Sequence, residues 1–113
     1  MQICISKKLK RDIEDDAKRK KRFGVEMAHK IKLRMDALRA ADSLVVFWPP
    51  YFGPERCHEL KGDLSGTFSM DLKHPYRLLF IPVDLEEGGA EDEKKRWQSI
   101  KSIEVKGIED THG

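Results

Sequence analysis

The sequence contains arginine and histidine residues that could form one site, in which arginine supplies a fixed positive charge and histidine transfers a proton. Arg77 lies in an otherwise apolar stretch, where a charged side chain must be paired or face a cleft. Its guanidinium stays charged and can hold a carboxylate or a phosphate through two donors. His58 and His112 carry imidazoles, which exchange protons near neutral pH. These residue types are suited to a site that binds an anion and moves a proton.

The charge is distributed unevenly along the chain. Residues 1–40 hold 13 Lys and Arg against 6 Asp and Glu, whereas residues 41–113 hold 9 against 14. A basic first part suits a polyanion such as RNA or an acidic protein partner, although a solvated helix face has the same composition. The length of 113 residues predicts one domain, residues 1–113, with a modest core.

Cysteine usage and hydropathy define the setting in which the protein is expected to work. Cys4 and Cys57 stand in no spacing typical of zinc, and isolated thiols favour a reducing compartment. No segment approaches the ~20 apolar residues of a membrane helix, and the N-terminus has no apolar run of signal-peptide length. We therefore expect a soluble, cytoplasmic protein without a metal, a cofactor or membrane contact.

Two helices are predicted in the basic part of the chain. From Lys7 to Arg22, Leu9, Ile13 and Ala17 recur every four residues and form a thin apolar stripe.

After a break at Gly24, a second helix is predicted from about Val25 to Ala41. Its apolar residues step by three or four and form a wider stripe. These residues are Met27, Ala28, Ile31, Leu33, Met35, Ala37 and Leu38.

Five short segments have the apolar patterns of β-strands. Thr67–Leu72 alternates strictly and places Ser69 and Asp71 together on one face. Tyr76–Val83 is a nearly continuous apolar run, which suits a central strand buried on both faces and ended by Pro82. The predicted strands are Gln2–Ile5, Cys57–Lys61, Thr67–Leu72, Tyr76–Val83 and Ile100–Ile108.

Two further segments are predicted to be loops. Ser43–Pro54 is rich in proline and aromatic residues, which either pack against the core or could stack on bases. Asp84–Glu93 is acidic and contains two glycines. The resulting order, β-α-α-β-β-β-β, predicts an α+β fold: a largely antiparallel sheet of about five strands with an N-terminal helical hairpin packed on it.

Three motifs in this order resemble those of a known superfamily. His58–Gly66, Asp71–Phe80 and Ile108–His112 look like the "L-K-G-x-x-x-G" turn, the "Y-R-L-x-F" strand and the "D-Y-H" ending of HigB-like proteins. These proteins form a branch of the RelE/ParE toxins, and similar chains are often labelled plasmid maintenance killer or killer suppression proteins. The resemblance covers most of the chain and implies the RelE-like fold.

The resemblance also implies a function, that of the toxin in a type II toxin–antitoxin pair. Such a toxin is an mRNA interferase, an endoribonuclease that cuts messages in the ribosomal A site and inhibits translation without a metal ion. Its implied partners are the ribosome, mRNA and a HigA-like helix-turn-helix antitoxin, through which the complex contacts DNA only indirectly. One alternative is a non-enzymatic binder on the same fold, either a gyrase-poisoning ParE-like toxin or an inactive toxin kept as antitoxin partner or repressor component. A plain RNA-binding module is a third possibility.

The implied cleavage uses the RNA 2′-OH as nucleophile and needs a base, an acid and positive charge. The resemblance makes Arg77 the candidate for the phosphate and His112 the candidate acid or base. Asp110 could orient His112 or accept a proton, and His58 is the second candidate histidine. We expect Arg77 and His112 to converge on one phosphate in a cleft beside the sheet. Without such roles, His58 would be a packed strand residue and His112 a frayed terminal one.

Further residues are candidates for contacts with RNA. Lys73 and His74 lie in a turn near Arg77 and could line the same cleft. Lys61 could contact phosphate as a point charge, and Tyr76 could stack on a base or simply pack. The basic helix from Lys7 to Arg22 could hold ribosomal RNA phosphates or an acidic antitoxin segment.

Two departures from the family pattern bear on activity. RelE itself has two lysines where this chain has Ser69 and Asp71, and an acid there would repel RNA. Thr111 replaces the tyrosine of the closing motif. Arg77 could, as an alternative to phosphate binding, form an ion pair with Asp71 or with Glu104 on a neighbouring strand.

Overall fold

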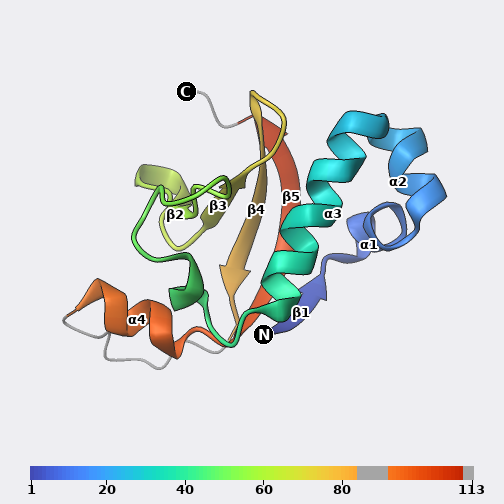
Figure 1. The fold of residues 1–113 in the computed structure, drawn as a ribbon. Helices are drawn as coiled ribbons and strands as arrows, with labels where there is room; N and C mark the ends of the chain where they lie inside the picture. The colour runs from blue at the N-terminus through green and yellow to red at the C-terminus, as the bar shows by residue number, and fades with distance from the viewer. Residues whose placement is uncertain (84–91, 111–113) are drawn as a thin grey trace.

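A five-stranded mixed sheet forms the centre of the computed structural model, which describes residues 1–83 and 92–110 (Figure 1). The strands lie in the order β1-β5-β4-β3-β2. β1 pairs with β5 in parallel, and the other three pairings are antiparallel. The α+β class and the largely antiparallel sheet are thus confirmed. The strands are β1 (Gln2–Ile5), β2 (His58–Glu59), β3 (Phe68–Asp71), β4 (Tyr76–Pro82) and β5 (Ser102–Asp110).

The basic part of the chain contains two short helices, so the prediction of one helix from Lys7 to Arg22 is wrong. α1 spans Lys7–Glu14 and α2 spans Asp16–Phe23. Asp15 interrupts them because its backbone is extended and its side chain accepts a hydrogen bond from the Lys18 backbone N–H, which caps α2.

A buried arginine fixes the corner between α1 and α2. Arg19 is 6% exposed, donates to the carbonyl of Ile13 and forms an ion pair with Asp16. The hydrogen bond that Arg19 donates to the Asp16 carboxylate, together with the positive charge of Arg19, lowers the pKa of the Asp16 carboxyl. Ala17, which was expected on the apolar stripe, is exposed because the break at Asp15 turns α2 away from the direction of α1.

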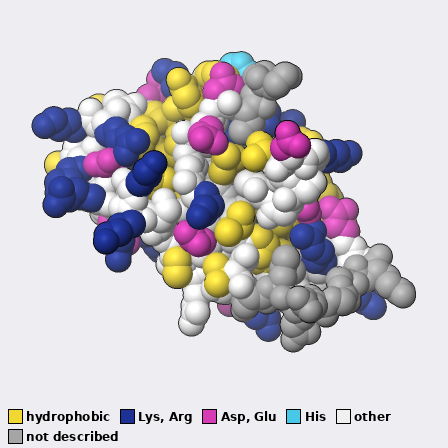
Figure 2. Space-filling view, turned by 180° about the vertical axis from the view of Figure 1, so that it is seen from behind, with side chains coloured by type: hydrophobic (Ala, Val, Ile, Leu, Met, Phe, Trp, Pro, Cys, Tyr) yellow, Lys and Arg dark blue, Asp and Glu magenta, His cyan; other side chains and the backbone are white. Residues whose placement is uncertain are grey.

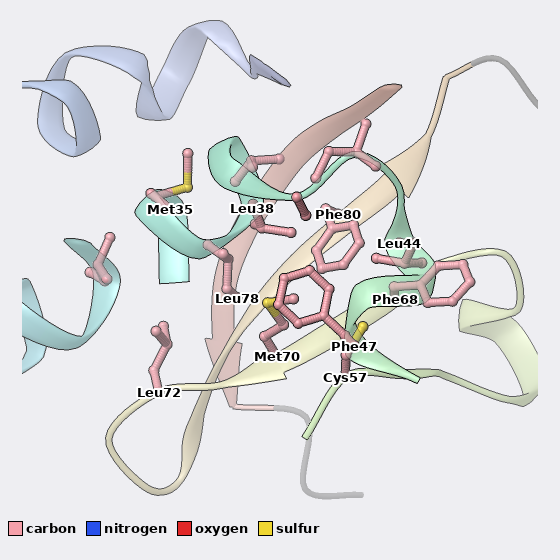
Figure 3. Packing of buried hydrophobic residues seen from close by; sticks show 14 of the residues in the cluster. Met35, Leu38, Leu44, Phe47, Cys57, Phe68, Met70, Leu72, Leu78 and Phe80 are labelled. Carbon is pink, nitrogen blue, oxygen red and sulfur yellow. The ribbon is translucent and has the colours of Figure 1, made fainter. Parts of the chain in front are cut away.

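The third helix, α3 (Val25–Ala40), covers one face of the sheet (Figure 1). Gly24 precedes it with a φ of 81°, a backbone conformation that glycine adopts without strain, so the predicted break is confirmed. The expected stripe of α3 is buried except for Ala37, which is half-buried, and Leu33, which is 46% exposed. Figure 3 shows Met35 and Leu38 of α3 in one group of buried side chains with Leu78 and Phe80 of the sheet.

β4 is the central strand, as its apolar run predicts. Leu78, Leu79 and Phe80 are all at most 4% exposed, and the strand ends at Pro82. On β3, Phe68 and Met70 belong to the core cluster under α3, which confirms the predicted alternation. The predicted strand Cys57–Lys61 is shorter in the structure, because only His58 and Glu59 pair with β3.

A fourth helix, α4 (Glu93–Ser99), was not predicted from the sequence. The Asp92 side chain caps it by accepting from the Lys94 backbone N–H, and Trp97 anchors it in the core. The Trp97 ring meets Trp48, which follows the 3₁₀ turn η1 (Leu44–Phe47), edge to face at 5.1 Å. The predicted acidic loop lies outside the described residues except for Asp92 and Glu93.

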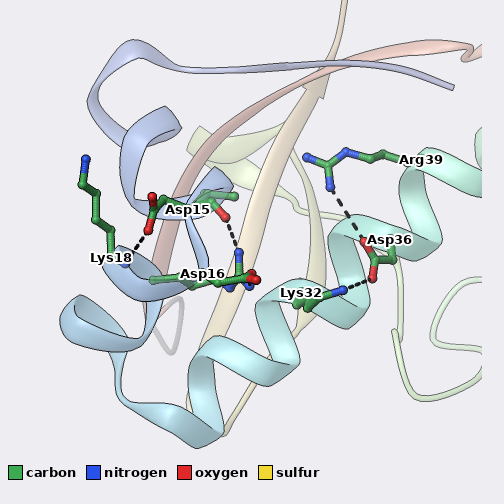
Figure 4. A network of polar contacts seen from close by, with 8 residues as sticks. Asp15, Asp16, Lys18, Lys32, Asp36 and Arg39 are labelled. Atoms are coloured by element: carbon green, nitrogen blue, oxygen red, sulfur yellow. Dashed lines mark hydrogen bonds and ion pairs between the residues drawn. The ribbon is translucent and has the colours of Figure 1, made fainter.

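The outer surface of the helical layer is polar. Figure 4 shows Asp36 of α3 between Lys32, whose Nζ lies 2.9 Å from one carboxylate oxygen, and Arg39, whose Nη1 lies 3.8 Å from the other. Such exposed pairs contribute little to stability. Within the part of the chain that is described, no helix combines the length and apolar character needed to cross a membrane.

Candidate anion-binding and proton-transfer site

The sheet carries its polar side chains on the face turned away from α3, called here the distal face. On β3, Ser69 and Asp71 alternate with core residues and therefore belong to this face. His58 of β2 is paired with Ser69, and Arg77 of β4 is paired with Asp71. Because paired residues of antiparallel strands point to the same side, these four side chains share the distal face.

Asp71 joins two arginines on the distal face. Its Oδ1 lies 3.7 Å from Nε of Arg77 and its Oδ2 lies 3.2 Å from Nε of Arg56. Arg77 is 26% exposed and Arg56 is 52% exposed, so both guanidinium groups reach solvent. The ion pair proposed as the structural alternative for Arg77 is confirmed, with Asp71 as its partner. Two guanidinium groups against one carboxylate still leave a net positive charge.

His58 is held in one orientation by its neighbours. Its Nδ1 lies 2.8 Å from the carbonyl oxygen of Arg56, which can only accept, so Nδ1 carries the hydrogen. In the neutral ring Nε2 is then the basic nitrogen, and it faces Ser69 Oγ at 3.5 Å. The imidazole stacks on the ring of Tyr51 with centroids 4.0 Å apart, and His58 is only 6% exposed. The geometry defines the tautomer, but Tyr51 covers the ring.

Tyr51 and Arg56 lie on the loop that leads to β2, and both have a left-handed backbone. Their φ values are 68° and 46°, which is uncommon for residues other than glycine. The Tyr51 N–H donates to the carbonyl of Cys57 at 3.1 Å, and the Asp71 N–H donates to the carbonyl of Glu55 at 2.8 Å. These bonds close the loop and fasten it to β3, so the strained conformations persist at the candidate site.

Arg34 of α3 supports the site from below. It is 7% exposed, and its Nε donates to the carbonyl of Asp71 at 2.7 Å while its Nη2 donates to the carbonyl of Pro54 at 3.1 Å. One guanidinium thus holds both backbone segments that carry the Arg56–Asp71 pair. Arg34 is a site residue that was not predicted from the sequence, although a charged residue between Ile31 and Met35 on a buried helical stripe is a detectable sign of such a role.

Tyr51 and Arg56 were not identified individually from the sequence. Tyr51 was only one of several aromatic residues in a predicted loop, and Arg56 is one of 22 Lys and Arg residues. Their place on the distal face depends on the shape of the loop, for which the sequence offers no glycine at either position. We call Tyr51, Arg56, His58, Asp71 and Arg77 the polar cluster.

Cys57 immediately precedes His58 but belongs to the core. It is fully buried, and desolvation together with the nearby Glu55 raises the pKa of its thiol. The neutral thiol packs as a small apolar side chain, so it adds no nucleophile to the polar cluster.

The β3–β4 turn lies beside the polar cluster. His74 and Tyr76 line a small pocket of about 40 Å³ together with Asp71 and Arg77, so His74 lies near Arg77, and the RNA contacts of His74 and Tyr76 stay predictions. Lys73 is not among the lining residues of that pocket. Its Nζ lies 3.0 Å from the Glu26 carboxylate of α3, and this ion pair draws it toward the helix.

Of the three remaining predicted site residues, two do not belong to the polar cluster and the third lies outside the described residues. Asp110 ends β5 opposite Tyr76, one ladder position beyond the Arg77–Glu109 pair. Lys61 is exposed just before the 3₁₀ turn η2 (Gly62–Leu64), at the β2 edge of the sheet. His112 lies outside the described residues, so its convergence with Arg77 stays a prediction.

A second charged surface lies over α1 and α2. Figure 2 shows Lys and Arg side chains gathered on the side of the molecule that these helices form, while acidic side chains are sparse there. Arg19 does not belong to this surface because it is buried. The exposed basic residues of α1 and α2 are Lys7, Lys8, Lys10, Arg11, Lys18, Lys20, Lys21 and Arg22.

The polar cluster can hold an anion between two guanidinium groups and offers one oriented imidazole nearby. Asp71 competes with any anion for both arginines, since it already neutralises one of the two charges. Among residues 1–83 and 92–110, no three His, Cys, Asp or Glu side chains are grouped so that they could hold a metal ion.

The chain is similar to known proteins in its three-dimensional structure, and its sequence matches no family model and no curated protein. Among solved structures, the chain is similar to a YoeB/ParE toxin from Agrobacterium tumefaciens, with 19% identity, a TM-score of 0.56, and coverage of 99% of this chain and 100% of that one. It is also similar to the YoeB–YefM complex from Staphylococcus aureus, with 18% identity, a TM-score of 0.56, and coverage of 100% and 98%.

These structures span the whole length of the chain, including the helical layer and all five strands. At such low identity the likeness concerns the backbone and not the side chains of the polar cluster. The fold predicted from the sequence is therefore confirmed: the chain has the α+β fold of YoeB/ParE-type toxins, which is the RelE/ParE-like fold.

Proposed function

We propose that the protein is the toxin of a type II toxin–antitoxin pair and that it cleaves messenger RNA on the ribosome. One observation carries the proposal: a fold shared with YoeB/ParE-type toxins presents Arg77 and Arg56 on either side of one carboxylate, beside an oriented imidazole. Such an activity would place the protein in the cytoplasm, with the ribosome and its message.

The proposed reaction is attack of an RNA 2′-OH on the adjacent phosphate, with departure of the 5′-oxygen. Arg77 and Arg56 bind the phosphate and stabilise the extra negative charge of the transition state. For this the RNA must displace Asp71 from at least one arginine, which makes Asp71 a competitor of the substrate.

Proton transfer requires an imidazole near the phosphate. His58 has its basic Nε2 defined by the Nδ1 hydrogen bond, so it is the first acid or base of the proposal, with Tyr51 keeping its place on the ring. The resemblance of the closing motif makes His112, supported by Asp110, the second acid or base of the proposal.

The proposed inhibitor is a protein antitoxin. The S. aureus YoeB neighbour is in a complex with YefM, and the HigB-like motifs of this chain point instead to a HigA-like helix-turn-helix partner. The exposed lysines and arginines of α1 and α2 suit an acidic segment of that antitoxin or the phosphates of ribosomal RNA. Contact with DNA is proposed only through the antitoxin complex.

Induced expression with mapping of message ends tests the proposal. The wild-type protein is expected to cut translated messages, and Arg77→Ala is expected to lower the cleavage rate about 10²- to 10³-fold, as for removal of one transition-state donor. His112→Ala and His58→Ala are expected to reduce cleavage as well.

The matched control is Arg39→Ala, which removes an exposed arginine that pairs with Asp36 on the outer surface of α3. It should cut at the wild-type rate. A correctly folded Arg77→Ala variant that also cuts at that rate would contradict the proposed site.

A non-enzymatic binder on the same fold is the second candidate. Two observations favour it: Asp71 already neutralises Arg77, and Tyr51 covers His58. Intact messages together with inhibited DNA supercoiling would identify a ParE-like gyrase poison. Absence of any effect on growth would identify an inactive toxin kept as a partner of the antitoxin.

A further inference from the structure

Tyr51 is the member of the polar cluster to which the proposed cleavage gives no task. Its ring is on the loop between α3 and β2, drawn in green in Figure 1, and the residue is 51% exposed. An exposed tyrosine on a loop normally changes its rotamer freely, but several contacts restrain this one.

The restraints come from both the backbone and the ring. The Tyr51 N–H bonds to the Cys57 carbonyl, and the Asp71–Glu55 and Arg34–Pro54 hydrogen bonds tie the same loop to β3 and α3. The inner face of the ring rests on the buried imidazole of His58 at 4.0 Å and an interplanar angle of 20°. Tyr51 is therefore a flat aromatic surface held in place, with much of its area in solvent.

Positive charge lies over this ring. The guanidinium carbon of Arg56 lies over the Tyr51 ring, 5.1 Å from its centroid, so a stacking base must share the ring with it or displace it, and the same guanidinium shares Asp71 with Arg77. In a nucleotide a planar base stands next to a phosphate, so a flat ring that contacts one arginine, which shares a carboxylate with a second arginine, matches its two halves.

We propose that Tyr51 is a nucleobase-stacking residue, and that the base it takes is the neighbour of the phosphate held by Arg56 and Arg77. The ligand class is single-stranded RNA with an unstacked base, because a base inside a duplex cannot expose its face to a side chain. The choice of RNA rests on the proposed function, whereas the stacking rests on the geometry of Tyr51. Stacking is sequence-tolerant, so Tyr51 positions the substrate without selecting a particular base.

Binding of a non-cleavable RNA tests this role separately from cleavage. The probe is a short single-stranded oligonucleotide with 2′-O-methyl riboses, which removes the nucleophilic hydroxyl, and with one 2-aminopurine base whose fluorescence falls on stacking. Tyr51→Leu is expected to weaken binding by about 5- to 150-fold, the range measured for loss of one base–aromatic stack, and to abolish the quenching. Tyr51→Phe keeps the ring and should bind within about twofold of the wild type.

An abasic probe identifies the partner of Tyr51. Removing the base should weaken binding to the wild type by a factor similar to that of Tyr51→Leu, and it should have no further effect in the Tyr51→Leu variant. The control is Phe52→Leu, which removes the adjacent ring, itself 60% exposed, and should leave binding unchanged.

The outcomes separate this inference from the proposed function. Unchanged binding in Tyr51→Leu, additive losses for the variant and the abasic probe, or no binding of the probe to the wild type would each overturn the stacking role. Message cleavage by the wild type together with any of these results would leave the proposed function standing. Base-dependent binding without message cleavage would support Tyr51 as the stacking residue and reject the nuclease.

Discussion

The two faces of β3 and β4 are built from alternating residues of the same strands, yet they differ in what holds them. On the face toward α3, Phe68, Met70 and Phe80 are fully buried among apolar side chains. On the distal face, Asp71 and Arg77 stay partly exposed and hold each other through charge. The face toward α3 is stabilised by apolar contacts, which a dissolved ligand does not replace. The distal face is held by ion pairs, in which a bound anion can take the place of the Asp71 carboxylate.

The largest expected effect tests the packed side of this comparison. Phe80→Ala deletes a fully buried ring that stacks on Phe68 at 5.8 Å, and it should lower the free energy of unfolding by about 3–5 kcal/mol. Urea denaturation of the purified protein measures this. The control is Val83→Ala near the end of β4, which is 55% exposed and should change stability by less than about 0.5 kcal/mol. Similar losses for both variants would break the comparison.

Arg34→Ala tests whether the polar cluster on the distal face depends on a side chain of α3, which covers the opposite face of the sheet. It removes two hydrogen bonds from a buried guanidinium and leaves the Asp71 and Pro54 carbonyls without that donor, so a loss of about 2–3 kcal/mol is expected. Amide exchange should accelerate most at the Tyr51 and Asp71 N–H groups, which belong to the loop contacts. Uniform acceleration over the whole sheet would show instead that Arg34 supports the fold at large.

Asp71→Asn tests whether the two arginines of the distal face bind phosphate once the carboxylate between them is removed. Removing the carboxylate frees Arg56 and Arg77 for phosphate, so RNA should bind several-fold more tightly, and the slope of log affinity against log salt should steepen by about 0.7, the value for one additional phosphate contact to a single strand. Titrations at several salt concentrations measure both.

The control for Asp71→Asn is Glu104→Gln, which removes a carboxylate that pairs with Lys106 on β5. It changes the net charge equally but should leave the slope unchanged. Equal steepening in both variants would mean that only net charge matters.

The smallest expected effect concerns Cys57, the core neighbour of His58. Because burial raises the pKa of its thiol, the unfolded chain releases this proton more readily than the folded protein. The stabilisation is therefore complete below the usual thiol pKa of about 8.5 and decreases as the pH rises above it. The stability difference between wild type and Cys57→Ala should shrink between about pH 8 and about pH 10, as urea denaturation at each pH would measure. A constant difference would contradict this account.

Thiol labelling provides the matching internal control. Cys4 is exposed on β1 and should react at once with a thiol reagent, whereas Cys57 should react only when the protein opens.

The elements that the sequence predicted well have long or strict patterns. The alternation of Thr67–Leu72, the apolar run of Tyr76–Val83 and the stripe of α3 each reflect burial on a defined face, and burial decides the structure there. α4 escaped prediction because seven residues with one buried anchor, Trp97, give no periodic pattern. The Asp15 break was missed because Leu9, Ile13 and Ala17 keep the spacing of four residues across a capping aspartate.

The candidate site was predictable only in part, for a different physical reason. Arg77 and His58 stand on strands, so their patterns place them on a face, and the pairing of Arg77 with Asp71 was one of the stated alternatives. Tyr51 and Arg56 come from a loop whose shape depends on tertiary hydrogen bonds to Glu55, Pro54 and Cys57. No local pattern encodes such contacts.

The position of β5 has a consequence for how the molecule assembles. β5 lies between β1 and β4, with Gln2 beside Ser102 and Phe80 beside Val105. Until this late strand is synthesised, the two neighbouring strands expose open edges, and the first strand has no lateral neighbour in the sheet. The sheet therefore cannot be completed until β5 has been synthesised. The incomplete sheet, with its open edges, is prone to aggregate, and early binding by a chaperone or partner would protect it.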